Sequence, residues 1–164
     1  MIRSVAVVQR SVAEAWPHAA GVAWIAIATP GCAVAVPPGS RALHLSFDTL
    51  AAELEAASVR LADAPPAQPF APRHARDIVD FVELLQRERE PVALLVCESE
   101  GLVRSATVAR WAAVRLDRPL HEGVAARVAS CPLTSGVLQD IAPMPRPWRN
   151  SRRTWVAVPS TMHG

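Results

Sequence analysis

The sequence of 164 residues contains no lysine and no tyrosine, so all 17 of its basic residues are arginine. They are balanced by 15 acidic residues, and a net charge of +2 is too small to indicate a nucleic-acid-binding surface by itself. No apolar run reaches the roughly 20 residues that a membrane-spanning helix requires. The longest candidate, residues 19–36, is interrupted by Gly21, Pro30 and Gly31, so we expect no contact with a membrane.

Cysteine is also scarce. The three cysteines, Cys32, Cys97 and Cys131, are widely spaced, and no apolar segment typical of a secretory signal precedes them. This usage favours free thiols in a reducing compartment, and we expect a cytoplasmic location, with Cys32 and Cys131 as small buried residues. Neither the cysteines nor the five histidines have the spacing of metal ligands, so we expect neither a metal nor a cofactor.

The chain is 51% hydrophobic, which excludes disorder over most of its length, and strand-like segments alternate with helix-like ones. Short apolar or alternating runs predict strands at residues 4–8, 22–28, 42–47 and 92–96. The last of these is the most strand-like run in the chain and predicts the centre of the sheet. Amphipathic periodicity predicts helices at residues 50–61, 74–89 and 103–116, with shorter ones at 124–129 and 133–141. We expect Trp24 and Trp111 in the core. The alternation predicts a single three-layer α/β domain over residues 1–142, in which helices flank a central, mostly parallel sheet of four or five strands.

Two segments are rich in proline. Residues 63–73 predict a loop, either a surface linker or a lid over a site. Residues 143–164 form a C-terminal extension with four arginines and no carboxylate, in which residues 154–158 resemble an edge strand. Because indole and guanidinium groups are enriched at interfaces, we expect the extension to bind another protein chain. Nucleic acid and a passive terminus are the alternatives. The partner-binding candidates are Trp148, Arg149, Arg152, Arg153 and Trp155.

Most of the candidate site residues lie in one segment, residues 94–113, with the sequence LLVCESEGLVRSATVARWAA. It reads as a strand, a polar loop with Gly101, an arginine and a helix. In an open α/β sheet, ligands bind where strands end and helices begin, because the free N–H groups of the helix attract anions. Arg104 would add a bidentate contact to a phosphate. The local pattern therefore indicates either an anion site or an ordinary connection.

This segment resembles the signature loop of cysteine-dependent protein tyrosine and dual-specificity phosphatases, in particular a small bacterial group. That group reads strand, His-Cys-Glu-Ala-Gly-Ile-Ser-Arg-Ser, then an alanine-rich helix. Residues 24–31, 43–48 and 75–85 resemble its second strand with a Pro-Gly turn, its third strand, and the helix before the signature strand. The resemblance covers residues 4–113 in order and spacing and implies the phosphatase fold.

An ungapped match to the family places a carboxylate where the family has its nucleophile. Cys97 falls on the family's histidine, Glu98 on its catalytic cysteine, and Val103 on the hydroxyl residue before the arginine. In the family, the thiolate attacks phosphorus while the loop N–H groups and the arginine hold the phosphate. The matched phosphate-loop positions are Glu98, Ser99, Glu100, Gly101, Leu102, Val103, Arg104 and Ser105.

The resemblance therefore implies a loop without catalysis. A carboxylate about 4 Å from a phosphate dianion costs on the order of several kcal/mol, and this loop has two, Glu98 and Glu100. We expect Glu98 to pair with Arg104 and to fill the space of a phosphate. The expected function is that of a pseudophosphatase, a protein tyrosine phosphatase-like domain that acts as a binding or assembly module.

One alternative stays open. A one-residue insertion would make Cys97 the nucleophile of an active phosphatase that hydrolyses phosphomonoesters, with Arg104 binding phosphate and Asp48 protonating the leaving oxygen. Asp48 is close to the family's general acid, although an ungapped match places Thr49 there, and Asp48 is equally suited to cap the helix at residues 50–61. A phosphorylated ligand bound without turnover is also compatible with the sequence.

Overall fold

The structure, a computed structural model, describes residues 1–48 and 68–142. Within these residues one sheet of five parallel strands has the order β3-β2-β4-β1-β5. Its strands are β1 (Ile2–Val7), β2 (Val22–Ala28), β3 (Arg41–Ser46), β4 (Val92–Glu98) and β5 (Leu120–His121). The predicted centre of the sheet is confirmed, because β4 is the middle strand.

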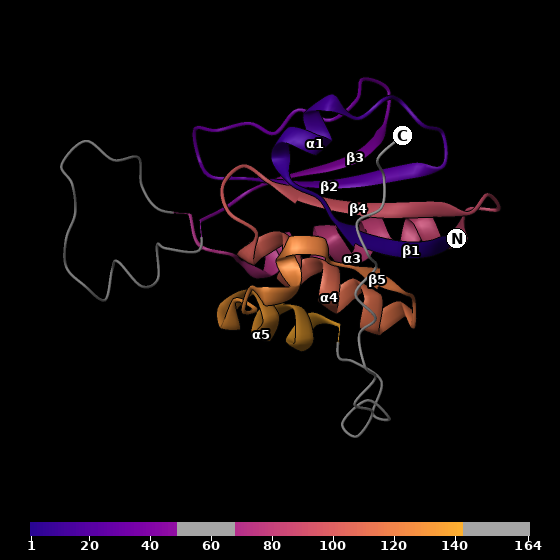
Figure 1. The fold of residues 1–164 in the computed structure, drawn as a ribbon. Helices are drawn as coiled ribbons and strands as arrows, with labels where there is room; N and C mark the ends of the chain where they lie inside the picture. Colours follow the sequence, from indigo (N-terminus) through magenta and orange to yellow (C-terminus); the bar gives the residue numbers. More distant parts are fainter. Residues whose placement is uncertain (49–67, 143–164) are drawn as a thin grey trace, which may run out of the picture.

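Helices cover both faces of the sheet and make three layers (Figure 1). The short helix α1 (Arg10–Ala15) lies on one face. The other face is covered by α3 (Pro72–Arg87), α4 (Val103–Leu116) and α5 (Pro132–Ile141), and a 3₁₀ turn, η1 (Gly123–Arg127), follows β5. The predicted α/β fold with a parallel central sheet is thus confirmed. None of the helices in residues 1–48 and 68–142 is both long and apolar enough to cross a membrane.

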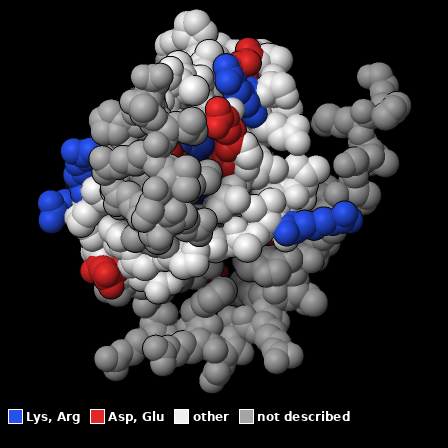
Figure 2. Space-filling view, turned by 90° about the vertical axis from the view of Figure 1, so that its left-hand side faces the viewer, with Lys and Arg blue, Asp and Glu red and all other residues white. Residues whose placement is uncertain are grey.

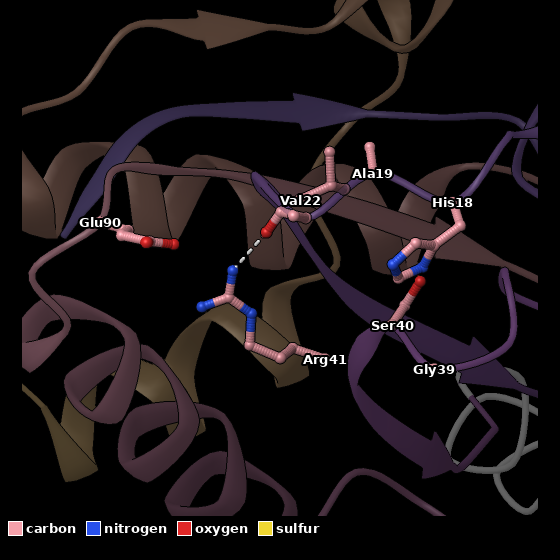
Figure 3. Close-up of a pocket in the computed structure, with 8 residues that line it drawn as sticks. His18, Ala19, Val22, Gly39, Ser40, Arg41 and Glu90 are labelled. Carbon is pink, nitrogen blue, oxygen red and sulfur yellow. Dashed lines mark hydrogen bonds between the residues drawn. The ribbon is translucent and has the colours of Figure 1, made fainter.

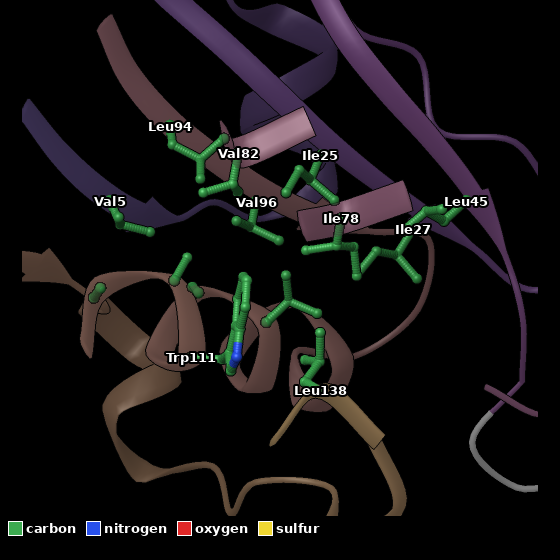
Figure 4. Close-up of a cluster of buried hydrophobic side chains, with 14 of the residues drawn as sticks. Val5, Ile25, Ile27, Leu45, Ile78, Val82, Leu94, Val96, Trp111 and Leu138 are labelled. Carbon is green, nitrogen blue, oxygen red and sulfur yellow. The ribbon is translucent and has the colours of Figure 1, made fainter. Parts of the chain in front are cut away.

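The two faces of the sheet carry separate apolar clusters, because successive side chains of a strand point to opposite faces. In β2, Ile25 and Ile27 belong to the cluster beneath α3, α4 and α5, whereas Trp24 belongs to the cluster beneath α1. In the larger cluster, beneath α3, α4 and α5, Trp111 of α4 and Leu138 of α5 point toward the strands (Figure 4). Burial of each such side chain contributes about 1.5–3 kcal/mol. The predicted core positions of Trp24 and Trp111 are confirmed.

Several sequence predictions need correction. The strand predicted to end at Val96 continues to Glu98, and α3 begins at Pro72, inside the stretch predicted as loop. Cys32 is exposed rather than buried, because it lies in the turn after β2, whereas Cys131 is buried as predicted. The two-residue strand β5 was too short to leave a pattern in the sequence. The helix predicted at 50–61, the strand predicted at 154–158 and the extension 143–164 lie outside the described residues.

The connections of the sheet define where a site is expected. From β2 the chain goes outward to β3, whereas from β4 it goes in the opposite direction, past β1 to β5. In open α/β sheets, ligands bind at the carboxyl ends of the strands where the connections diverge in this way. The site expected at this edge therefore lies between Thr29, which follows β2, and the loop from Glu98 to Leu102 that leads into α4.

Candidate functional site

Arg104 is the centre of the site expected here, and it is almost completely buried, at 4% exposed. Its side chain starts from the first turn of α4 and reaches across the carboxyl ends of three strands. Nε donates a hydrogen bond to Oε2 of Glu98 at 2.9 Å, and Nη1 donates to the backbone oxygen of Phe47, just beyond β3, at 2.7 Å. Nη2 donates to Oγ1 of Thr29 at 3.2 Å and to the backbone oxygen of Glu100 at 3.4 Å. One guanidinium therefore connects α4 to the ends of β2, β3 and β4.

Glu98 occupies the anion position at the amino end of α4. Its Oε2 accepts a hydrogen bond from the backbone N–H of Arg104 at 3.1 Å, and the backbone N–H of Ser105 also acts on the carboxyl to lower its pKa. These are N–H groups that a helix leaves without partners in its first turn, and the helix dipole favours negative charge there. The predicted pairing of Glu98 with Arg104 is confirmed, at a salt bridge whose two side chains are almost completely buried.

The second oxygen of Glu98 differs from the first. Oε1 is buried and has no hydrogen-bond partner among the described residues. It lies close to Gly101, where a Cβ would come within 3.6 Å of it, and Gly101 has a φ of +76°, which favours glycine. Burial raises the pKa of the Glu98 carboxyl, while the charge of Arg104 and the backbone N–H groups of Arg104 and Ser105 act in the opposite direction.

Cys97 points to the other face of the sheet. The strand β4 extends through both residues, so Cys97 and Glu98 alternate, and Cys97 packs with Trp24 and Leu95 in the cluster beneath α1. Its Sγ contacts the backbone oxygen of Ile25 at 3.9 Å, and the side chain is fully buried. Burial, reinforced by the charge of Glu98, raises the pKa of the Cys97 thiol to about 12. The structure therefore does not bring Cys97 and Arg104 together.

The other loop positions provide framework contacts. The Ser99 hydroxyl accepts the backbone N–H of Thr29 at 3.0 Å, and the Ser105 hydroxyl donates to the backbone oxygen of Leu102 at 3.3 Å. Val103 has no polar group and is 39% exposed, and Glu100 is exposed. The loop thus ties β2 to β4, and its second carboxylate faces solvent.

Asp48, the candidate proton donor, directly follows Phe47, whose backbone oxygen accepts a hydrogen bond from Nη1 of Arg104. Its backbone N–H donates to the oxygen of Gln68 at 2.7 Å, and its backbone runs parallel to Pro69. The structure therefore places the Asp48 backbone beside Phe47, at the margin of the Arg104 site.

Sequence reasoning did not identify Thr29, Phe47 or His74 as part of this region. The Phe47 ring lies beneath the Arg104 guanidinium, with Cζ of Arg104 5.9 Å from the ring centroid. The rings of Phe70 and His74 also contact it, with centroids 4.8 Å and 5.3 Å from its own. Thr29 and Phe47 each follow the last residue of a strand, and this position is the signal that would have identified them.

The face at the carboxyl ends of the strands carries both signs of charge. Figure 2 shows basic and acidic side chains lying beside one another on this face, and not gathered by sign. Arg10 forms a salt bridge with Glu14 at 2.7 Å and also interacts with the charge of Glu100. The charged side chains that are visible on this face are therefore mixed in sign.

A separate pocket of about 270 Å³ lies at the opposite edge of the sheet, at the amino ends of β2, β3 and β4. Figure 3 shows His18, Ser40, Arg41 and Glu90 around it, with Arg41 donating a hydrogen bond to the backbone oxygen of Ala20 at 2.5 Å. None of the residues singled out from the sequence lines this pocket. In residues 1–48 and 68–142, no group of three His, Cys, Asp or Glu side chains is placed to hold a metal ion.

No family model, no curated protein and no solved structure matches this chain. The partner-binding candidates Trp148, Arg149, Arg152, Arg153 and Trp155 lie outside the described residues, so the prediction for them stays a prediction.

The three thiols should differ sharply in reactivity. We expect iodoacetamide at pH 8 to label Cys32 rapidly, because it is exposed, and to leave Cys97 and Cys131 unlabelled in the folded protein. A pKa of about 12 in place of 9.0 makes the thiolate fraction of Cys97 about a thousandfold smaller at this pH. Peptide mass spectrometry over a time course measures each rate, and Cys32→Ser should abolish the fast phase. Rapid labelling of Cys97 would contradict its placement on the covered face.

Proposed function

We propose that this chain is a protein tyrosine phosphatase-like domain without catalytic activity, a pseudophosphatase that serves as a binding or assembly module. The observation that carries the proposal is the position of Glu98. Its carboxylate takes the Arg104 side chain and the first backbone N–H groups of α4, which are the donors that an oxyanion ligand would need. The site thus contains its own anion.

Two features support the loss of catalysis. The thiol that directly precedes Glu98, Cys97, is on the face of the sheet opposite Arg104, and a pKa of about 12 keeps it protonated at neutral pH. A thiol in this state is a poor nucleophile, because the thiolate is the attacking species. Glu98 cannot substitute for it while its Oε2 accepts hydrogen bonds from the backbone N–H and from Nε of Arg104.

Electrostatics supports the same proposal. A phosphate dianion about 4 Å from the Glu98 carboxylate would cost on the order of several kcal/mol, and the charge of Arg104 is already shared with that carboxylate. A phosphorylated ligand would bind at Arg104 only after Glu98 had moved away or taken up a proton. Binding of another protein chain requires no such change, and it is the activity that we assign to the module.

Hydrolysis of an aryl phosphate tests the loss of catalysis. The purified chain should show no turnover above that of Cys97→Ser, because no thiolate faces Arg104. Initial rates from pH 5 to pH 9 measure this, and thermal denaturation of both proteins confirms that they are folded. Turnover in the parent chain that disappears in Cys97→Ser would overturn the proposal and establish the alternative with Cys97, Arg104 and Asp48.

Removal of the internal anion tests the role of Glu98. We expect Glu98→Ala to lower the free energy of unfolding by about 3 kcal/mol, because Arg104 loses its buried partner. Formate or phosphate should restore part of this loss by occupying the vacated position, which is measured by thermal denaturation against chloride at equal ionic strength.

The matched control is Glu100→Ala, which removes an exposed carboxylate from the same loop. Its stability should change by less than about 0.5 kcal/mol and should show no response to formate or phosphate beyond that of the parent chain. Equal responses of the two variants to these anions would contradict the assignment of Glu98 as an internal anion.

The partner, in this proposal, is another protein chain bound through residues 143–164, in a cytoplasmic setting that suits three free thiols. Replacing Trp148 and Trp155 together by alanine should weaken this association at least tenfold, since a buried indole commonly contributes more than about 1.4 kcal/mol. Co-purification with the parent and variant chains at two salt concentrations measures the effect. A complex that is unchanged in the variant, or that disappears on nuclease treatment, would contradict it.

A further inference from the structure

The helix α3 begins with an unusual cap. Its N-cap residue, Ala71, has no polar side chain, and the first turn contains no acidic residue. Instead, Nδ1 of His74, the third residue of the helix, accepts the backbone N–H of Ala71 at 3.1 Å. Glutamate or glutamine normally makes this backward contact from the third position. A histidine there makes the cap dependent on a group that gains a proton near neutral pH.

Both nitrogens of the His74 ring face donors. The backbone N–H of Ala71 points at Nδ1, and Nε of Arg73 lies 3.2 Å from Nε2. A neutral imidazole has one nitrogen that accepts a hydrogen bond, whereas the protonated ring has none. Protonation would therefore remove the side-chain acceptor that His74 provides for the Ala71 N–H at the start of α3. It would also place a positive charge beside Arg73 and at the positive end of the helix dipole.

The ring of His74 is also part of a buried stack that leads to Arg104. His74 is 6% exposed and lies against the Phe47 ring, with centroids 5.3 Å apart and planes inclined by 27°. The Phe47 ring in turn lies beneath the Arg104 guanidinium, and the Phe47 backbone oxygen accepts a hydrogen bond from Nη1 of Arg104. A change in the position of His74 therefore reaches Arg104 through one residue that contacts both.

The charges around His74 act in one direction. Burial lowers the pKa of His74, the charge of Arg73 lowers it further, and Asp77, one turn along α3, opposes them. Across the stack, Arg104 is the charged group beyond the Phe47 ring, and it is paired with Glu98. Asp48 follows Phe47 in the chain. Because the unfolded chain binds a proton at His74 more readily than the folded chain does, this contribution to stability is complete above about pH 6.5 and is lost as the pH falls through the lowered value.

We propose that His74 is a proton-sensitive cap that couples the start of α3 to the Arg104 site. When neutral, it closes the first turn of α3 and supports Phe47 beneath Arg104. When protonated, it releases the Ala71 N–H and loosens the stack, so that mild acid weakens the anchoring of Arg104. The inference rests on the geometry of His74, Phe47 and Arg104 and is independent of the proposed function.

Hydrogen exchange of the full chain, followed by NMR, tests this device. Between pH 7.5 and pH 5.0, the protection factor of the Ala71 amide should fall about tenfold, and that of the Arg104 Nε–H should fall with it. In His74→Gln, glutamine retains an acceptor at the third helix position but does not titrate. Both protection factors should then be the same at the two pH values.

The matched control is His44→Gln, which removes an exposed histidine from β3 and should leave the parent behaviour unchanged. Protection at Ala71 that does not depend on pH in the parent chain would overturn the proposal. So would an equal fall in His74→Gln. A fall at Ala71 without a fall at Arg104 would overturn the coupling. The parent chain alone decides the first and third outcomes, so the test does not depend on the folding of a variant.

Discussion

The buried pair of Glu98 and Arg104 is the interaction on which the carboxyl edge of the sheet depends. Burial of two charges costs free energy that their attraction recovers only when other hydrogen bonds complete the arrangement. Here the guanidinium donates to four acceptors, on Glu98, Phe47, Thr29 and Glu100. Lysine would not replace it, because a single ammonium group cannot reach acceptors spread around a planar fork. The pair therefore organises the region whatever the domain binds.

The length of β4 decides the chemistry of the loop. If the strand ended at Val96, Cys97 would belong to the loop and would be free to turn toward Arg104. Because β4 continues, pairing Cys97 with Ala26 and Glu98 with Ile27 of β2, the two side chains take opposite faces. The thiol lies in the apolar cluster beneath α1, and the carboxylate lies on the opposite face, where it pairs with Arg104. Two extra residues of strand thus separate a site with a potential nucleophile from a site filled by its own carboxylate.

The Arg104 site combines a buried ion pair, which stabilises the fold, with a histidine that is sensitive to pH. Phe47 lies between a permanently charged group, Arg104, and a titratable one, His74, so it transmits the state of one to the other. An aromatic ring suits this position because it packs against both planar groups. The backbone oxygen of the same residue accepts the hydrogen bond from Nη1 of Arg104. Oε1 of Glu98, buried without a partner among the described residues, is the weak point of the arrangement.

Much of this architecture is determined by local sequence. The bounds of β2 and α4 agree with the prediction, because β2 is apolar on both faces and α4 is rich in alanine and other apolar residues and follows a loop with glycine. The pairing of Glu98 with Arg104 was also predictable, since opposite charges six residues apart flank a strand-to-helix turn. The exposure of Cys32 and the start of α3 at Pro72 were not, because both depend on how a turn and a loop meet the sheet.

By itself, the sequence determined the layers of the fold, the central strand and the charged loop, because hydrophobic periodicity and turn residues act over short distances. Only the tertiary structure decided on which face of the sheet Cys97 lies and which groups besides Glu98 accept hydrogen bonds from Arg104. It also decided that His74 caps α3 beside Phe47. These features depend on strand register and on contacts between residues far apart in the chain. For Arg104, two of the four acceptors, on Thr29 and Phe47, lie 75 and 57 residues away. No local pattern carries that information, because it exists only once the strands lie side by side.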